Sequence, residues 1–140
     1  MSVSHDSTIL GVETGRRRYA ITPAQVDHIG LLDPKGEPSD QHGRMLICRD
    51  LGPLLGGDAT TIAGRYHAIT VSLRRRSVAL MIDRIDSLDG EGPLEIQPLA
   101  PLLSRHLARP WFLGAVVYQG EPLLLLDLRR IATDVAIGAV

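Results

Sequence analysis

The chain has 140 residues, with 15 basic residues against 16 acidic ones and a formal net charge of −1 at pH 7. A chain of this length can bury a real core as one domain, and its near-neutral charge provides no overall attraction to nucleic acid or to an anionic membrane. The single cysteine, Cys48, excludes an internal disulfide framework and a cysteine-rich zinc site, and its apolar neighbours predict a small core residue. No apolar run reaches the roughly 20 residues of a membrane span, and residues 1–7 lack the features of a signal peptide, so we expect a cytoplasmic protein.

The first half of the chain predicts short strands joined by turns. Thr22 is a suitable N-cap and Pro23 suits the first position of a helical turn. Val26 and Ile29 follow three residues apart, as they would on one face of that turn. Residues 33–43 are rich in proline, glycine and polar side chains, which is typical of an exposed loop. Strands are expected at residues 9–13, 19–22 and 45–48, and helical turns at residues 23–29 and 50–55.

The second half contains the most strongly patterned stretch, residues 112–128. Two apolar runs flank a turn at Gln119-Gly120-Glu121, which predicts a β-hairpin. Its second arm has four consecutive leucines, so we expect both faces of that strand to be covered. Asp127 is then a suitable N-cap for a short helical turn. The other strands are expected at residues 66–73, 78–82 and 94–96, and a short helix at residues 98–107.

The two halves of the chain repeat each other in two blocks. In the first block, Ala20-Ile21 matches Ala79-Leu80 and Val26-Asp27 matches Ile85-Asp86, at one constant offset and after an arginine triplet in both copies. In the second block, GRMLICRDLGPLL from residue 43 matches GEPLLLLDLRRIA from residue 120. The second half has more chain between its blocks, including the first arm of the hairpin. We therefore expect the first half to lack one strand, just before Gly43.

The motifs of catalysis and metal binding are not found in this sequence. The five histidines are scattered, and the acids at residues 83–91 match no ligand loop, so we expect turn residues and no metal, cofactor or enzymatic activity. The arginine triplets at residues 16–18 and 74–76 leave a nucleic-acid-binding barrel open, with solvated turns as the alternative. Four apolar residues follow the strand ends of the two copies and could line a groove for an apolar helix, or could be ordinary core: Val26, Ile29, Ile85 and Leu88.

Several stretches together resemble the CheW-like family, the adaptor proteins of bacterial chemotaxis arrays. They are VALMIDRIDSL at 78–88, PLAPLL at 98–103 and FLGAVVYQGEPLLLLDLRRI at 112–131, with RRRYAITPAQVDHI at 16–29 and GRMLICRDLGPLLG at 43–56 in the first half. The resemblance implies a mainly β fold of two SH3-like β-barrel subdomains, packed around a shared core with a few short helices. It implies one domain over residues 8–133, with tails at 1–7 and 134–140. The first barrel would span about 15–60, with exchange of a terminal strand, and the second about 64–128.

The resemblance also implies a non-enzymatic scaffold that links chemoreceptors to a histidine kinase. The cytoplasmic tip of a chemoreceptor would bind in the groove between the barrels, where Val26 falls on the family's groove valine. The regulatory domain of the kinase would bind one barrel, near a turn that reads Asn-Leu-Arg-Gly in the family. Here residues 40–43 read DQHG, so His42 stands at the arginine position. The residues expected at the rim or at the kinase contact are Asp27, His42, Arg44, Met45 and Asp86.

Two further interpretations concern the partner. The altered first barrel favours, as an alternative, a divergent adaptor of another signalling or motility pathway. A strand missing from that barrel would leave an edge across which a homodimer could pair.

Overall fold

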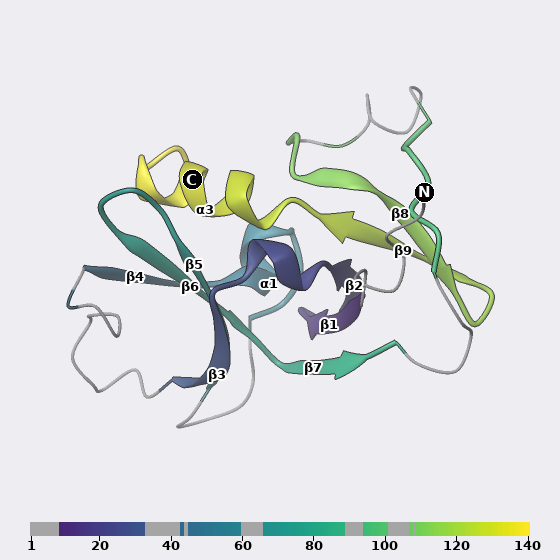
Figure 1. Ribbon diagram of the computed structural model, residues 1–140, viewed down its shortest axis with the longest axis horizontal. Helices are drawn as coiled ribbons and strands as arrows, with labels where there is room; N and C mark the ends of the chain where they lie inside the picture. Colours follow the sequence, from purple (N-terminus) through teal and green to yellow (C-terminus); the bar gives the residue numbers. More distant parts are fainter. Residues whose placement is uncertain are drawn as a thin grey trace.

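The computed structural model describes residues 9–32, 43, 45–59, 66–88, 94–100, 107 and 109–140. These residues form two β-sheets that lie side by side, with short helices between and above them (Figure 1). The prediction of a mainly β protein with a few short helices is confirmed.

The two sheets take their strands from both halves of the chain. The five-stranded sheet has the order β7-β1-β2-β9-β8, and the four-stranded sheet has the order β3-β5-β6-β4. The strands of the first are β1 (Leu10–Thr14), β2 (Arg17–Ile21), β7 (Arg84–Ser87), β8 (Phe112–Tyr118) and β9 (Glu121–Leu126). Those of the second are β3 (His28–Leu32), β4 (Leu46–Asp50), β5 (Tyr66–Ser72) and β6 (Ser77–Ile82). The helices are η2 (Pro23–Gln25), α1 (Leu51–Leu54) and α3 (Leu128–Ala136).

The sequence repeat reappears as one pairing scheme used twice. The antiparallel hairpin β1–β2 has β9 as a parallel neighbour, and the antiparallel hairpin β5–β6 has β4 in the same place. The register agrees, because Ala20 opposes Leu125 in one sheet and Ala79 opposes Cys48 in the other. The strand after each hairpin crosses over: β3 pairs with β5, and β7 pairs with β1. The exchange of strands is therefore more extensive than an exchange at the termini, whereas the domain bounds at residues 8 and 133 stay a prediction.

Strand β9 is covered on both faces, as predicted, whereas β8 exposes Leu113 and Val117. Leu123 and Leu125 join one buried cluster, whereas Leu126 belongs to the main core and Leu124 packs against it. The alternation follows from the period of a strand, in which successive side chains point to opposite faces. The turn places Gln119 at φ 51° and Gly120 at φ 80°, the left-handed pair of a type I′ turn that matches the twist of the flanking strands.

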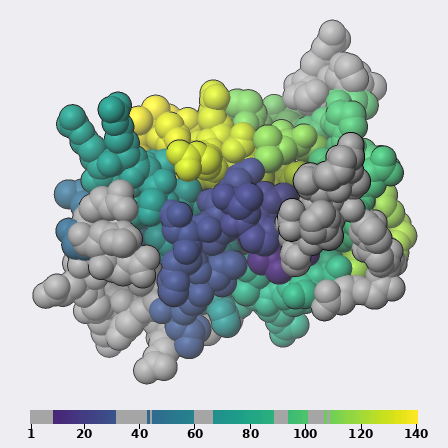
Figure 2. All heavy atoms as spheres, in the orientation of Figure 1, coloured from purple at the N-terminus to yellow at the C-terminus, as the bar shows by residue number. Residues whose placement is uncertain are grey.

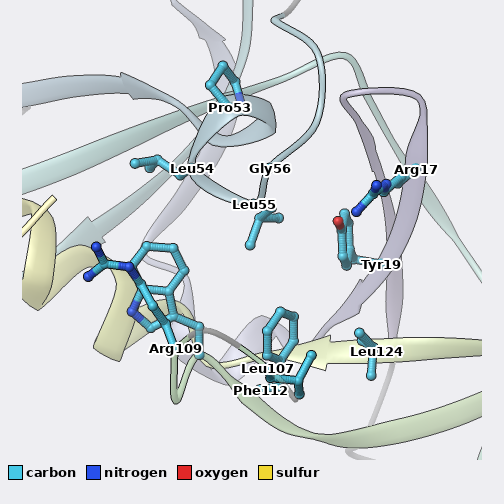
Figure 3. Close-up of a pocket in the computed structure, with 11 residues that line it drawn as sticks. Arg17, Tyr19, Pro53, Leu54, Leu55, Gly56, Leu107, Arg109, Phe112 and Leu124 are labelled. Atoms are coloured by element: carbon cyan, nitrogen blue, oxygen red, sulfur yellow. The ribbon is translucent and has the colours of Figure 1, made fainter. Parts of the chain in front are cut away.

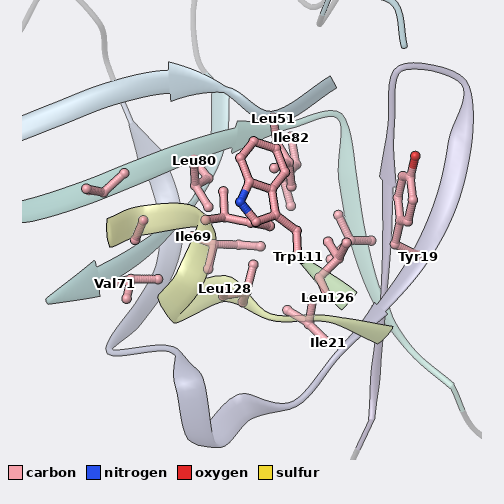
Figure 4. Close-up of a cluster of buried hydrophobic side chains, with 14 of the residues drawn as sticks. Tyr19, Ile21, Leu51, Ile69, Val71, Leu80, Ile82, Trp111, Leu126 and Leu128 are labelled. Carbon is pink, nitrogen blue, oxygen red and sulfur yellow. The ribbon is translucent and has the colours of Figure 1, made fainter. Parts of the chain in front are cut away.

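Trp111 lies at the centre of the main core, between the two sheets (Figure 4). Its side chain is 2% exposed, and its indole Nε1–H donates to Oδ2 of Asp134 at 2.7 Å. Asp134 belongs to α3, which begins where the Asp127 carboxylate accepts from the backbone N–H of Arg130 at 3.2 Å. One face of α3 is buried: Leu128, Ile131, Ala132 and Val135. The helix therefore covers the seam between the sheets, and it extends to Ala136, beyond the short turn that was predicted.

The second predicted helical turn is confirmed as α1. The Asp50 carboxylate accepts from the backbone N–H of Gly52 at 3.2 Å, and the turn ends at Gly56, whose φ is 81°. Gly52 is required here, because a Cβ atom on it would lie 2.2 Å from the carbonyl oxygen of Asp58.

The helical turn predicted at residues 23–29 is confirmed for η2, with Thr22 at its N-cap and Pro23 at its start, but not beyond Gln25. Helical structure ends at Gln25, because Val26 is extended with φ −114° and ψ 131°, and β3 then pairs along its whole length with β5. Pairing with a distant strand outweighs a spacing of three residues between two apolar side chains. Residues 94–96 are likewise not a strand, since only Gln97 forms an isolated bridge, with Ala115. Residues 98–100 are not helical, and the rest of the helix expected there, residues 101–106, lies outside the described residues.

The prediction that Cys48 is a small core residue is wrong, because its side chain is exposed. Its counterpart in the repeat, Leu125, is 1% exposed because β8 supplies Val116 and Tyr118 to the same cluster. Beside Cys48 the corresponding cluster is reduced to three residues: Leu46, Ala68 and Ala79. The strand expected to be missing would precede Gly43, and residues 33–42 lie outside the described part of the chain.

Candidate partner-binding surface

Two exchanged segments form the part of the fold that the sequence singled out for partner binding. η2 and β3 leave the end of β2 and join the other sheet, while β7 leaves the end of β6 in the opposite sense (Figure 1). The segment from η2 to β3, in blue, runs down the middle of one face of the molecule (Figure 2).

The two crossings place equivalent apolar residues on the same core. Val26 follows η2 and Ile85 lies on β7, opposite the fully buried Val12. Both side chains are half-buried, and both pack against the main core around Trp111. The structure therefore brings Val26 and Ile85 onto one cluster, and each keeps part of its surface in contact with solvent.

The other predicted pair does not behave symmetrically. Leu88 is 7% exposed and belongs to the cluster that contains Val116 and Tyr118. Its counterpart Ile29 is half-exposed on β3, opposite Ile69, because the cluster on that side is smaller. Leu88 thus has little surface to offer a partner, whereas Ile29 keeps some. We name the half-exposed set Val26, Ile29 and Ile85 the crossing surface.

Gln25 holds the first crossing in place, and the sequence pattern did not indicate this role. Its side-chain oxygen accepts from the backbone N–H of Leu128 at 2.6 Å and of Arg129 at 3.4 Å, which are unpaired donors at the start of α3. A residue from the first half thereby caps a helix of the second half. Because this contact spans the chain, no local spacing could have revealed it.

The two predicted rim aspartates are both engaged within the protein. The Asp27 carboxylate accepts from the backbone N–H of Ser72, and the backbone N–H of Asp27 donates to the carbonyl of Thr70 at 2.9 Å. Asp86 forms an ion pair with Arg18 at 3.3 Å. These contacts connect the first exchanged segment to β5 and the second to β2. Both carboxylates are therefore held in place beside the crossing surface.

The three remaining predicted residues are His42, Arg44 and Met45. His42 and Arg44 lie outside the described residues. Met45 precedes β4, its side chain is 64% exposed, and its carbonyl accepts from the backbone N–H of Ser77 at 3.0 Å. A large apolar side chain is therefore available to solvent at the start of β4.

A hollow of about 340 Å³ lies away from all the predicted site residues, between α1, β2 and the hairpin β8–β9 (Figure 3). Leu54, Leu55, Phe112 and Leu124 supply much of its apolar wall. Arg17 enters from β2 beside the hydroxyl of Tyr19, as Figure 3 shows. The guanidinium of Arg109 stacks on Trp111, 5.1 Å from the ring centre. Apolar periodicity could not reveal this hollow, because its residues come from four separate segments.

Among the residues that the structure describes, no group of three histidine, cysteine or acidic side chains is placed to hold a metal ion. The same residues contain no helix that is long and apolar enough to cross a membrane. Cys48 is exposed, but it is partly desolvated by the surrounding protein, and this partial burial raises the pKa of its thiol above the ordinary value.

Comparison with known proteins agrees with this architecture. The model of the CheW-like domain matches residues 8–136, nearly the whole chain. The chain belongs to the CheW-like family. This is a family of scaffold and adaptor proteins of chemotaxis, and the two sheets described above are its two barrel-like subdomains.

The solved structures that match this chain include one with the CheW-like fold at low sequence identity. It is the scaffolding protein TtCheW from Thermoanaerobacter tengcongensis, with a TM-score of 0.60 and 13% identity over 88% of this chain and 85% of that chain. The search of curated proteins found no match. The CheW-like resemblance seen in the sequence is thus confirmed by both the family match and the fold.

Proposed function

We propose that this CheW-like protein is a non-enzymatic adaptor of the cytoplasm that joins a chemoreceptor tip to a histidine kinase by protein contacts alone. The observation that carries the proposal is the pair of exchanged segments. They leave Val26 and Ile85 half-buried on one shared core, each beside an aspartate held by the protein itself.

The crossing surface suits a helical partner for physical reasons. Its side chains are apolar and partly solvated, so a partner that covers them gains about 25 cal/mol for each Å² removed from water. Its backbone is held by strand pairing and by Gln25, so little conformational entropy is lost on binding. The rim ion pair of Asp86 with Arg18 is exposed, and we expect it to orient the partner more than to add affinity.

The contact with the kinase is the second part of the proposal. We assign it to the barrel formed by β3, β4, β5 and β6, where Met45 is exposed and where His42 replaces the arginine of the family's turn. A histidine cannot reproduce the five fixed donors of a guanidinium, so we expect weaker coupling to the kinase than to the receptor.

The test is calorimetric titration of the whole protein with a soluble chemoreceptor tip bundle and, separately, with a kinase regulatory domain. Val26→Asp should weaken receptor binding at least about tenfold, because a buried interface position would then hold an unpaired charge. Val117→Asp is the matched control, since Val117 is 46% exposed on β8, outside the crossing surface. Val26→Thr keeps the shape of the side chain but adds a hydroxyl, so it should bind less tightly, and its melting temperature measures any loss of stability separately.

The outcomes separate the candidate functions. Equal effects of Val26→Asp and Val117→Asp, or no binding of either partner, would remove the adaptor proposal. Binding of the receptor without the kinase would favour the alternative adaptor for another signalling or motility pathway.

A further inference from the structure

The two arginine triplets occupy equivalent positions in the repeat but have different surroundings. Arg16–Arg18 lies at the turn from β1 to β2, and the triplet at residues 74–76 lies at the tip between β5 and β6. In the first triplet, Arg16 pairs with Asp58 at 3.3 Å. Arg18 pairs with Asp86 and also lies over the ring of Tyr118, 5.5 Å from its centre. Most of the charge of the first triplet is therefore balanced within the protein.

The second triplet keeps its charge unbalanced. Arg76 donates from Nη1 to the carbonyl of Ala136 at 2.8 Å, which ties the tip to the end of α3. Arg74 and Arg75 are exposed, and neither forms an ion pair or a hydrogen bond within the described part of the chain. Figure 1 shows the tip of β5–β6 beside the final turn of α3, and Figure 2 shows teal side chains projecting there next to yellow ones.

Helix α3 adds a fourth arginine to this place. Arg129 lies with Arg74, Arg75 and Arg76 around an open hollow of about 690 Å³, and no acidic residue is among those that line it. The floor is mainly apolar, because Leu73, Ala136 and Ile137, which is 71% exposed, line it together with Thr133. We name this site the arginine hollow.

Apart from the bond of Arg76 to Ala136, such a grouping gives the isolated protein no benefit. Like charges about 10 Å apart in water repel by roughly 0.4 kcal/mol for each pair. The chain has a net charge of only −1, so the four arginines are a local concentration of positive charge and do not reflect an overall excess. The acids that neutralise the first triplet have no equivalent among the residues that line the hollow. The charge is therefore available to a ligand.

We propose that the arginine hollow binds an acidic protein segment that carries an aliphatic side chain. Guanidinium groups bind carboxylates in a planar, two-pronged geometry, and the apolar floor can take one aliphatic side chain between them. No aromatic side chain lines the hollow, so it has no platform on which a nucleic-acid base could stack. The hollow shares no lining residue with the crossing surface, but it lies close to it, because Gln25 bonds to Arg129 and Asp27 bonds to Ser72.

The experiment measures fluorescence anisotropy of a labelled glutamate-rich peptide with a central leucine, titrated with the whole protein at low salt. Arg74→Glu combined with Arg75→Glu should weaken binding at least about tenfold, and Ile137→Ser should weaken it about threefold. Arg17→Glu reverses one charge on the first triplet and is compared with the single variant Arg75→Glu; we expect no more than a twofold effect at Arg17. The same peptide with serine in place of leucine should bind more weakly to the unmodified protein.

Three results would overturn the proposal. One is an equal loss of binding with Arg17→Glu, which would show a response to net charge alone. Another is equal binding of the serine peptide, which would show that the apolar floor is not used. The third is tighter binding, dependent on Arg74 and Arg75, to a DNA duplex or to vesicles that contain phosphatidylserine, which would assign the arginines to a different class of partner. Each variant folds if its circular dichroism and melting temperature match those of the unmodified protein.

Discussion

Replacing Asp134 by alanine tests whether the indole of Trp111 is a polar anchor of the shared core. The Nε1–H group is buried with Trp111, and its described acceptor is Oδ2 of Asp134 at 2.7 Å. In Asp134→Ala the donor has no described partner, and Trp111, at 2% exposure, gives it little access to water.

The magnitude follows from three contributions. A hydrogen bond to a charged acceptor contributes about 1.5–3 kcal/mol to stability. Leaving the buried donor unpaired is the same loss seen from the donor's side, so it is counted once. The ion pair of Asp134 with Arg130, at 3.9 Å, contributes about 0.3 kcal/mol on a helix surface. Alanine is a better helix former than aspartate by about 0.5 kcal/mol, which offsets that loss. We expect a net loss of about 2 kcal/mol and a melting temperature lower by roughly 8 °C.

The assay is urea unfolding followed by tryptophan fluorescence, since Trp111 is the only tryptophan in the chain. Asp134→Asn keeps an acceptor and should lose about half as much stability as Asp134→Ala. Asp58→Ala is the control, because its ion pair with Arg16 is exposed on both sides and should contribute less than about 0.5 kcal/mol.

A loss below about 0.5 kcal/mol for Asp134→Ala would refute this account of the core. A double-mutant cycle with Trp111→Phe, followed by circular dichroism, gives a second check. If the two losses simply add, the indole and the carboxylate are not coupled, and the bond does not stabilise the protein.

Three other predictions concern single positions. Gly114→Ala should lower stability by about 1–3 kcal/mol in urea unfolding, because its Cβ would lie 2.4 Å from the carbonyl oxygen of Gln97; an unchanged midpoint would contradict the close approach. Asp127→Ala should cost about 1 kcal/mol by loss of the N-cap of α3, and Asp127→Ser should restore most of it. Cys48 should react with iodoacetamide in the folded protein because it is exposed. The reaction rate should rise at a higher pH in the folded protein than in urea-unfolded protein, because the raised pKa leaves less thiolate at neutral pH. If the rate in the folded protein rose at the same pH as in the unfolded chain, or at a lower pH, the raised pKa would be disproved.

Much of the first sheet could be read from local patterns. The run of leucines in β9, its turn at Gln119 and Gly120, and the N-cap Asp127 each concern residues that are close in sequence, and each prediction is confirmed. The repeat predicted which residues are equivalent, and the parallel registers of Ala20 with Leu125 and of Ala79 with Cys48 agree with it.

Equivalence in the repeat did not extend to burial. Leu88 is buried whereas Ile29 is half-exposed, and Leu125 is buried whereas Cys48 is exposed. The cause lies in β8, which adds Val116 and Tyr118 to one cluster and has no counterpart among the described residues of the other sheet. Burial depends on neighbours that are distant in sequence, so a matched pattern cannot determine it.

The sequence by itself determined the periodicity of the strands, the helical turn of α1, the N-cap of α3 and the membership in a family of two-barrel adaptors. Only the tertiary structure decided that β3 and β7 exchange sheets, that Gln25 caps α3, and that Arg129 joins residues 74–76. The physical reason is range: caps and turns are local hydrogen bonds within a few residues, whereas strand partners are chosen by the burial of surfaces far apart along the chain. The crossing surface and the arginine hollow both arise from that second kind of choice.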